Sequence, residues 1–195
     1  MKAKLNSIAL FGTSADPPTL GHQALLSELI KVFPKVITWA SDNPDKKHQI
    51  PLLKRTELLR ILVKKISHPK LELVQELSSP RTINTLKKAL LIWPEASFSF
   101  VIGSDLTDQI PKWLNAKSVL TKAKISIAIR DGWPIHDTQL KEIEKLGGEV
   151  ELLPFNIPKS SSTNFRKKPE EALIPSELIP TLLKENLYGF ADNKK

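Results

Sequence analysis

ALFGTSADPPTLGH, residues 9–22, joins an apolar run to the predicted start of a helix. The run is apolar at successive positions, which is typical of a parallel strand that is buried on both faces. Gly12 then lets the backbone approach a ligand closely, and Thr13 supplies a hydroxyl donor. A helix that begins at Leu20 points its free N–H groups at this loop, where they favour an anion. The stretch therefore predicts a strand, a loop and a helix arranged around phosphate.

Short apolar runs alternate with helical patterns along the rest of the chain. Strands are predicted at residues 7–11, 35–40, 71–74, 98–103, 125–130 and 150–153. Helices are predicted at residues 20–33, 51–66, 83–93 and 138–146. This alternation favours a parallel α/β sheet, in which ligands bind beyond the carboxyl ends of the strands. We predict a single Rossmann-like α/β domain over residues 1–195, with helices on both faces of the sheet and a small C-terminal helical part at about 160–190.

Composition narrows the class of protein. A length of 195 residues with 26% charged residues is typical of one globular domain. The chain has no cysteine, which excludes disulfides and thiolate metal sites and fits a reducing compartment. We find no signal-peptide pattern and no run long enough to span a bilayer, so we expect a cytoplasmic protein without membrane partners. A homo-oligomer is compatible with this composition.

The formal net charge is +8, which suits anionic partners of several kinds. The lysines are spread over predicted helices and mixed with acidic residues, and no basic block is interleaved with aromatic residues. This distribution favours solvated helix faces over a stripe that binds nucleic acid. It also suits a pocket for a polyphosphate.

The residues around the predicted helix start have the chemistry of a phosphate-transfer site. Thr19 precedes the helix and His22 lies on its first turn, so both side chains can face one phosphate, and Gly21 leaves room for it. A positive imidazole there would stabilise charge on a pentavalent phosphorus. Each residue alone has an ordinary interpretation, because a Thr before a helix is usually an N-cap. Their combination after a buried strand is more specific, although it lacks the Lys and the second glycine of the familiar phosphate loops.

GTSADPPTLGH resembles the signature of the nucleotidylyltransferase superfamily, a G-x-F-D-P loop followed by H/T-x-G-H. The resemblance implies an enzyme that joins a nucleotide monophosphate to a second substrate and releases pyrophosphate. Two positions depart from the signature. Ala15 stands where the family has an aromatic residue, and Thr13 replaces the second of its paired glycines. The phosphate-handling positions Thr19 and His22 are kept.

KSSSTNFRKKP, residues 159–169, is a second group of phosphate-type side chains. Hydroxyls before a short helical turn offer N-cap groups, and Arg166 one turn further brings a forked guanidinium to the same anion. Taken alone, such a string is more commonly a serine-rich loop that caps a helix. It is similar to the superfamily's I-S-S-T-x-I-R segment, with Ser160 in place of an aliphatic residue. The resemblance assigns the β- and γ-phosphates of ATP to Ser161, Ser162, Thr163 and Arg166.

VIGSDLTDQIPKWLNAKSVL, residues 101–120, narrows the substrate. Gly103 ends a predicted strand, so Asp105 lies at its carboxyl end, where a carboxylate can hold ribose hydroxyls or cap a helix. Trp113 is either a core residue or a stacking surface for a flat ring. The segment resembles I-G-x-D…W…L of the nicotinate mononucleotide adenylyltransferases. In that family the Asp region lines the nucleotide site and the Trp region stacks near the pyridine ring.

Looser matches to the same family occur elsewhere in the chain. Thr85 matches its S-Y-T-x-x-T-L segment, although Arg81 replaces the Tyr. Arg130 in AIRDGWP matches an R-x-P-G-Y element near ATP, and LYGF resembles the family's C-terminal helix. ASDNPDKKHQ, with the later KR, occupies the place of the family's mononucleotide loop, and it reads otherwise as a polar surface turn. From that loop the resemblance takes Asn43, Lys47 and Arg55.

The resemblance implies transfer of the adenylyl group of ATP to nicotinate mononucleotide, which yields nicotinate adenine dinucleotide and pyrophosphate in NAD biosynthesis. The expected catalytic residues are His22, Thr19 and Arg166. The expected ATP contacts are Gly12, Thr13, Gly21, Gly103, Asp105, Arg130, Ser161, Ser162 and Thr163. The expected mononucleotide contacts are Asn43, Lys47, Arg55, Thr85 and Trp113. No covalent nucleophile and no metal ligands from the protein are expected, and Mg²⁺ would arrive with ATP.

Three alternatives stay open at this point. A nicotinamide-mononucleotide or pantetheine-phosphate adenylyltransferase belongs to the same superfamily. A non-catalytic nucleotide-binding regulator on the same fold is compatible with the departures at Ala15 and Ser160, although Thr19, His22 and Arg166 argue against it. A basic nucleic-acid binder would be retained on DNA or RNA in a salt-dependent manner.

Overall fold

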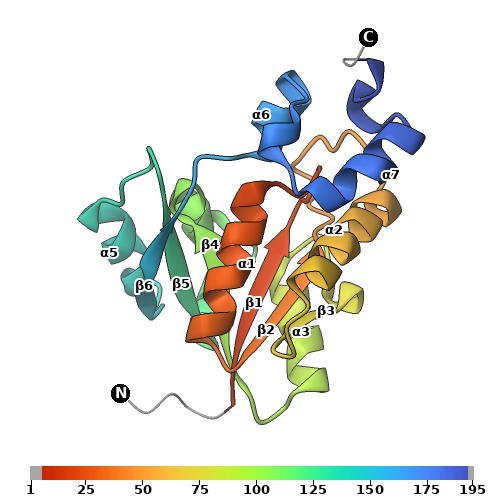
Figure 1. Ribbon diagram of the computed structural model, residues 1–195. Coiled ribbons are helices and arrows are strands. Elements are labelled where there is room, and N and C mark those ends of the chain that lie inside the picture. Colours follow the sequence, from red (N-terminus) through yellow and green to blue (C-terminus); the bar gives the residue numbers. More distant parts are fainter. Residues whose placement is uncertain (1–5, 193–195) are drawn as a thin grey trace.

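The computed structural model describes residues 6–192, in which six strands form one parallel sheet (Figure 1). The strands are β1 (Ser7–Thr13), β2 (Lys35–Ala40), β3 (Leu71–Leu73), β4 (Ser97–Gly103), β5 (Ala123–Arg130) and β6 (Val150–Ile157). Their order is β3-β2-β1-β4-β5-β6, and every neighbouring pair is parallel. The order reverses between β1 and β4, so the loops after these strands flank the place where such sheets bind ligands. The predicted α/β class is confirmed.

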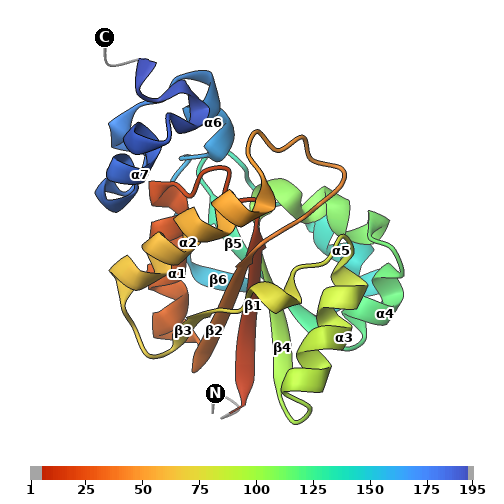
Figure 2. The same ribbon diagram turned by 90° about the vertical axis from the view of Figure 1, so that its right-hand side faces the viewer.

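Helices cover both faces of the sheet. One face carries α1 (Leu20–Val32) and α2 (Leu52–Ile66), and the other carries α3 (Thr82–Ile92), α4 (Ala116–Leu120) and α5 (Asp137–Lys145) (Figures 1 and 2). Because side chains alternate along a strand, Ile8 and Leu10 of β1 pack in the core beneath α3, whereas Ala9 and Phe11 pack in the core beneath α1. Both faces of β1 are therefore buried, which explains the successive apolar residues from Ile8 to Phe11.

The C-terminal segment consists of short helices. They are α6 (Ser162–Lys167), α7 (Ile179–Lys184) and 3₁₀ turns at Glu171–Leu173, Ser176–Leu178 and Leu187–Gly189. They share an apolar cluster with Leu58 of α2, and its other buried members are Phe165, Ile174, Leu178, Leu182, Tyr188 and Phe190. This cluster holds the segment beside α2, at the top of Figure 1, where the carboxyl end of β1 also lies.

The predicted strands and the four predicted helices agree with the structure apart from their ends. β6 runs to Ile157 instead of residue 153, because its second half alternates between buried and exposed positions and hides the apolar pattern. The sequence patterns did not predict α4 or the 3₁₀ segments at Gln75–Leu77 and Ser104–Lys112. Very short helices and 3₁₀ segments show no helical period in the sequence.

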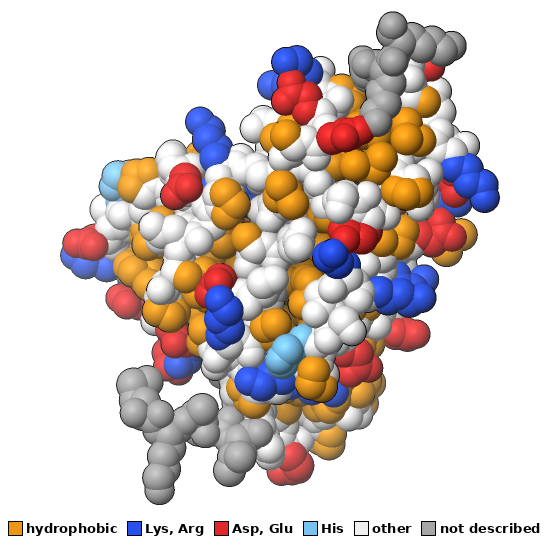
Figure 3. Space-filling view, in the orientation of Figure 1, with side chains coloured by type: hydrophobic (Ala, Val, Ile, Leu, Met, Phe, Trp, Pro, Cys, Tyr) orange, Lys and Arg blue, Asp and Glu red, His pale blue; other side chains and the backbone are white. Residues whose placement is uncertain are grey.

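Charged side chains of both signs are interspersed on the face of the molecule shown in Figure 3. Lys and Arg do not gather there into a stripe, in keeping with the mixture of signs along the chain. Within residues 6–192, no helix combines the length and the apolar character needed to cross a membrane.

Candidate active site

A cleft of about 740 Å³ opens at the carboxyl ends of the strands. All but two of the predicted site residues lie on its walls: Gly12, Thr13, Gly21, His22, Asn43, Lys47, Thr85, Gly103, Asp105, Trp113, Arg130, Ser161, Ser162, Thr163 and Arg166. Thr19 and Arg55 do not line it. The two motifs from opposite ends of the chain therefore meet in one cleft.

Hydrogen bonds on both ring nitrogens fix the imidazole of His22. The backbone N–H of Thr19 donates to Nδ1 at 3.0 Å. Because Nδ1 accepts, the ring proton lies on Nε2, which donates to Thr13 Oγ1 at 2.8 Å. Thr13 Oγ1 also accepts the N–H of Ala15 at 3.2 Å. Since both lone pairs of this oxygen are used, the Thr13 hydroxyl proton is left to donate to an anion in the cleft.

Thr19 lies behind the imidazole and not in the cleft. It is the N-cap residue of α1 and is fully buried, and its hydroxyl lies 2.9 Å from Nδ1 of His22. The sequence pattern placed Thr19 on the phosphate. In the structure its polar groups are instead turned to the ring, so we propose that Thr19 acts on phosphate only by orienting His22.

The imidazole of His22 is neutral in the free protein. Burial, together with the positive charges of Arg130 and Lys46, lowers the pKa of His22 from 6.5 to about 4. The sequence reading expects a positive ring beside the reacting phosphorus, and this expectation concerns the complex with substrate and not the free protein. A positive imidazole therefore requires an anionic ligand nearby.

A neutral His22 makes the stability of the protein depend on pH. The unfolded chain protonates this side chain below pH 6.5, whereas the folded protein does so only near pH 4. Because the unfolded state binds more protons in this interval, the contribution of His22 is fully present above pH 6.5 and is lost as pH falls toward 4. We expect the free energy of urea unfolding to decline more steeply between pH 6.5 and 4.5 for the native chain than for His22→Gln. Parallel declines would contradict the neutral ring.

Gly21 gives the segment before α6 room to approach α1. A Cβ at Gly21 would lie 2.8 Å from the backbone carbonyl oxygen of Ser160, which cannot move aside alone. We expect Gly21→Ala to push this segment from the cleft, to cost about 1–3 kcal/mol of stability and to raise KM for ATP about 10-fold. Steady-state kinetics and urea unfolding measure both effects, with Gln23→Ala on the same helix as the control. An unchanged KM would show that the approach of this segment does not matter for ATP.

Side chains of α6 are bonded directly to the loop after β1. The Ser162 hydroxyl donates to the carbonyl of Pro17 at 2.7 Å, and Arg166 Nη1 donates to the carbonyl of Asp16 at 2.6 Å. Arg166 Nη2 lies 3.3 Å from the hydroxyl oxygen of Thr163. The loop and α6 therefore form one continuous wall that presents a guanidinium and hydroxyls to the cleft.

The two serines before α6 have structural partners. Ser161 is the N-cap of the helix, and its Oγ accepts the N–H of Asn164 at 3.2 Å. The hydroxyl of Ser160 lies 3.4 Å from the carbonyl oxygen of Leu173. The departure at Ser160 from the aliphatic residue of the superfamily thus faces the C-terminal segment and not the phosphate side.

Asp105 and Arg130 form an ion pair at the ends of β4 and β5, with 2.7 Å between Oδ2 and Nη1. The Ser104 hydroxyl braces the pair, because it accepts the N–H of Arg130 at 2.9 Å and donates to the carbonyl of Trp133 at 2.6 Å. Asp105 Oδ1 and Arg130 Nε are buried and have no hydrogen-bond partner among the described residues. Buried polar atoms are costly when unpaired, so this pair is ready for a polar ligand such as a sugar hydroxyl.

The residues predicted to contact the mononucleotide differ in how far their polar groups are already used within the protein. Trp113 meets Phe100 edge-on, with 6.2 Å between ring centroids, and it is partly exposed in the cleft. The Thr85 hydroxyl donates to the carbonyl of Leu77 at 3.0 Å, so its proton is already used by the fold. Asn43 Oδ1 accepts the N–H of Asp45 at 2.9 Å, which shapes the turn after β2.

Arg55 is separated from the cleft and is 1% exposed. Nη1 donates to the carbonyls of Ser14 and Ser41 at 2.7 Å each, and Nε donates to the carbonyl of Ile50 at 3.3 Å. The expected contact between Arg55 and the mononucleotide is therefore corrected. Its guanidinium joins the loop after β1 to residues 41–51, which form the other rim of the cleft.

Trp39 lines the cleft, although the sequence reading did not include it. A Cβ at Gly12 would lie 2.5 Å from Cζ2 of Trp39, so the glycine makes room for the indole as well as for a ligand. The pair of an aromatic residue at the end of β2 and a glycine at the end of β1 was the available signal, because adjacent parallel strands end at the same edge.

Lys46 is a second cleft residue that the sequence reading missed. Removal of its ammonium group from water lowers the pKa of Lys46, Asp105 opposes this shift, and Arg130 and Arg166 lower the pKa further. The adjacent Lys47 was predicted from the sequence and lines the cleft as well. The charges around Lys46 place it among the groups that an anionic ligand would meet.

Comparison with known proteins agrees with this geometry. Residues 10–168 match the model of the family described as cytidylyltransferase-like. A solved structure described as Plasmodium falciparum nicotinic acid mononucleotide adenylyltransferase complexed with NaAD superposes with a TM-score of 0.79 at 24% identity, over 95% of this chain and 98% of the other. That likeness supports the fold.

Relatives in sequence identify the family more specifically than the structural likeness does. A protein of Synechocystis sp. with the name "Probable nicotinate-nucleotide adenylyltransferase" is 33% identical, over 93% of this chain and 98% of its own length. A protein of Listeria monocytogenes with the same name is 22% identical, over 94% of this chain and 98% of its own length. The chain therefore belongs to the nicotinate-nucleotide adenylyltransferase family, within the cytidylyltransferase-like proteins.

Proposed function

We propose that this protein transfers the adenylyl group of ATP to nicotinate mononucleotide and releases pyrophosphate. The observation that carries the proposal is the meeting of His22, the Thr13 hydroxyl and Arg166 around one cleft, in a chain of this family. A phosphate oxygen of the mononucleotide attacks the α-phosphorus of ATP in line. This P–O bond forms as the bond from the α-phosphorus to the bridging oxygen breaks, and pyrophosphate leaves with the electron pair. The attacking oxygen is already anionic, so no general base is needed.

The residues of the cleft act by position and charge. We place the α-phosphate beside His22 and Thr13, and the leaving pyrophosphate beside Arg166 and the start of α6. Phosphate charge favours the protonated ring and raises the pKa of His22 above its value in the free protein, and on protonation Nδ1 would give up the hydrogen bond from the Thr19 N–H. The resulting imidazolium stabilises the charge that develops in the transition state. We propose that Asp105 binds sugar hydroxyls.

Mg²⁺ is proposed to arrive with ATP. Among residues 6–192 there is no group of three or more His, Asp or Glu side chains that could hold a metal ion. The cleft offers cations, hydroxyls and the Asp105 carboxylate, whose Oδ1 has no hydrogen-bond partner among these residues. This donor set fits an ion that substrate phosphates and water mainly hold, with Asp105 as a contact through water. When bound, the ion would neutralise phosphate charge.

Pyrophosphate release from ATP and Mg²⁺ tests the proposal. Nicotinate mononucleotide, nicotinamide mononucleotide and pantetheine phosphate are supplied in separate reactions, and we expect strong preference for the first. Equal use of both mononucleotides would extend the substrate to the amide, and use of pantetheine phosphate alone would reassign the enzyme. Binding of ATP without release from any of the three would favour a non-catalytic regulator. A chain without cysteine also suits the cytoplasm as the proposed place of action.

A further inference from the structure

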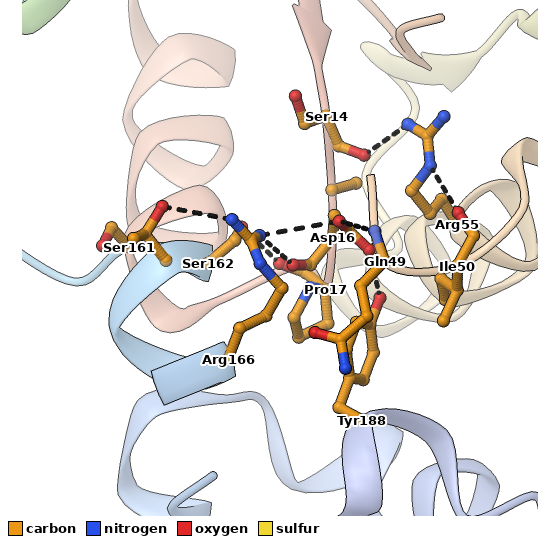
Figure 4. A network of polar contacts seen from close by, with 12 residues as sticks. Ser14, Asp16, Pro17, Gln49, Ile50, Arg55, Ser161, Ser162, Arg166 and Tyr188 are labelled. Carbon is orange, nitrogen blue, oxygen red and sulfur yellow. Dashed lines mark hydrogen bonds and ion pairs between the residues drawn. The ribbon is translucent and has the colours of Figure 1, made fainter. Parts of the chain in front are cut away.

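The carboxylate of Asp16 lies at a junction on the phosphate side of the cleft (Figure 4). Asp16 is 1% exposed. Its Oδ1 accepts the hydroxyl of Tyr188 at 2.8 Å, and its Oδ2 accepts the N–H of Gln49 at 2.8 Å. Oδ2 also lies 3.6 Å from Nη1 of Arg166, which donates to the backbone carbonyl of the same aspartate at 2.6 Å. A single residue thus contacts Arg166 through two of its oxygens.

These partners come from segments far apart in the chain. Gln49 belongs to residues 41–51, Arg166 lies on α6, and Tyr188 lies in the last 3₁₀ turn. Asp16 itself follows β1. One buried carboxylate therefore joins the first loop, the rim of the cleft and the C-terminal segment, although the reaction proposed above gives it no direct role.

We propose that Asp16 is a positioning residue, which holds the guanidinium of Arg166 toward the pyrophosphate end of ATP while Tyr188 fixes the orientation of the carboxylate. The inference rests on the proposed function in one respect, namely that Arg166 binds the leaving pyrophosphate. The side chain of Arg166 is 24% exposed and has many rotamers, so it needs such contacts to keep one direction. Arg55 does not compete for this role, because its guanidinium is already held by three carbonyls.

Tyr188 is suited to lock the carboxylate in place. Its ring packs edge-on against Phe165 at 5.8 Å between centroids, in the cluster shared with α2. Burial raises the pKa of the Tyr188 hydroxyl, and the charge of Asp16 raises it further. The hydroxyl therefore remains a donor across the neutral range. The C-terminal segment thus supplies both Arg166 and the group that orients its anchor.

A double-mutant cycle tests the inference. The proteins are the native chain, Asp16→Asn, Arg166→Ala and the double variant, and calorimetry measures their affinity for inorganic pyrophosphate. Asp16→Asn keeps the size of the side chain but removes its charge. We expect it to weaken pyrophosphate binding about 10-fold and to add nothing in the Arg166→Ala background. Additive losses would overturn the inference, because Asp16 would then act independently of Arg166. Asp137→Asn, exposed on α5, is the control and should bind as the native chain does.

Tyr188→Phe keeps both charges and the ring packing, so it provides a second cycle if Asp16→Asn fails to fold. We expect pyrophosphate binding to weaken about threefold, and only while Arg166 is present. A loss of equal size in the Arg166→Ala background would overturn the role of Tyr188. Because these titrations need no turnover, the two ideas can fail separately. Turnover of nicotinate mononucleotide together with additive losses of pyrophosphate affinity would support the proposed function and overturn the role of Asp16. Non-additive losses of pyrophosphate affinity in a protein that turns over no mononucleotide would support the role of Asp16 and overturn the proposed function.

Discussion

The His22→Ala variant is expected to release pyrophosphate with a kcat about 10²- to 10³-fold lower than that of the native chain. The imidazole lies in the cleft and is held through Nδ1 by Thr19 and through Nε2 by Thr13. Its removal takes away the group that we propose becomes positive beside the α-phosphate. KM for ATP should change less, since Arg166 and the start of α6, which we propose bind the leaving phosphates, remain in place.

The control for this variant is His68→Ala. His68 precedes β3, at the amino end of the strands and away from the cleft, and its Nδ1 accepts the N–H of Lys70 at 3.2 Å. We expect its kcat to equal that of the native chain. Circular dichroism and thermal unfolding should show that His22→Ala is folded. Near-normal turnover by folded His22→Ala would remove this residue from the reaction.

The Arg55→Met variant is expected to lose about 3–5 kcal/mol of the free energy of unfolding. The substitution keeps much of the side-chain volume but removes every donor of the guanidinium. The carbonyls of Ser14, Ser41 and Ile50 would lose a buried partner, and the buried carboxylate of Asp16 would lose a neighbouring positive charge. Unsatisfied buried acceptors carry their full desolvation cost, so the loss exceeds that of an ordinary surface change.

Arg60→Met is a matched control, because Arg60 lies on the same helix and is exposed. We expect its free energy of unfolding to change by no more than about 0.5 kcal/mol. Urea unfolding at pH 7 measures both variants. Equal stability of Arg55→Met and Arg60→Met would show that the three carbonyls can accept hydrogen bonds from water instead.

The sheet was predictable because a strand that is buried on both faces has apolar residues at successive positions of the sequence. Residues 8–11 of β1 and residues 100–102 of β4 are apolar at successive positions, which is typical of strands covered by helices on both sides. The C-terminal helices and turns were harder to predict, since segments of three to six residues are too short to show a periodic pattern. Their common core with Leu58 depends on the path of the chain in space. The assignment of the whole chain to one domain stays a prediction.

The site was predictable as far as residue type decides the role. His22 and Arg166 carry chemistry that few structural positions require, and both reach the cleft. Thr19 and Arg55 do not line the cleft, because spacing shows which residues are near a loop but not which side of it they face. Lys46 also lines the cleft and was not predicted, because the family resemblance pointed only to the neighbouring Lys47. Direction is set by tertiary packing, which the sequence pattern does not contain.

Arg166 and Tyr188 come late in the sequence, which has a consequence for folding during translation. The six strands that the structure describes end by Ile157, so they are translated before Arg166 and Tyr188. The ribosome synthesises the chain from its amino end, at about 5–20 residues per second. The sheet can therefore assemble while the last helices are still being translated. An mRNA that ends soon after the codon for Ile157 would therefore yield the strands without Arg166, the residue proposed to bind the leaving phosphates.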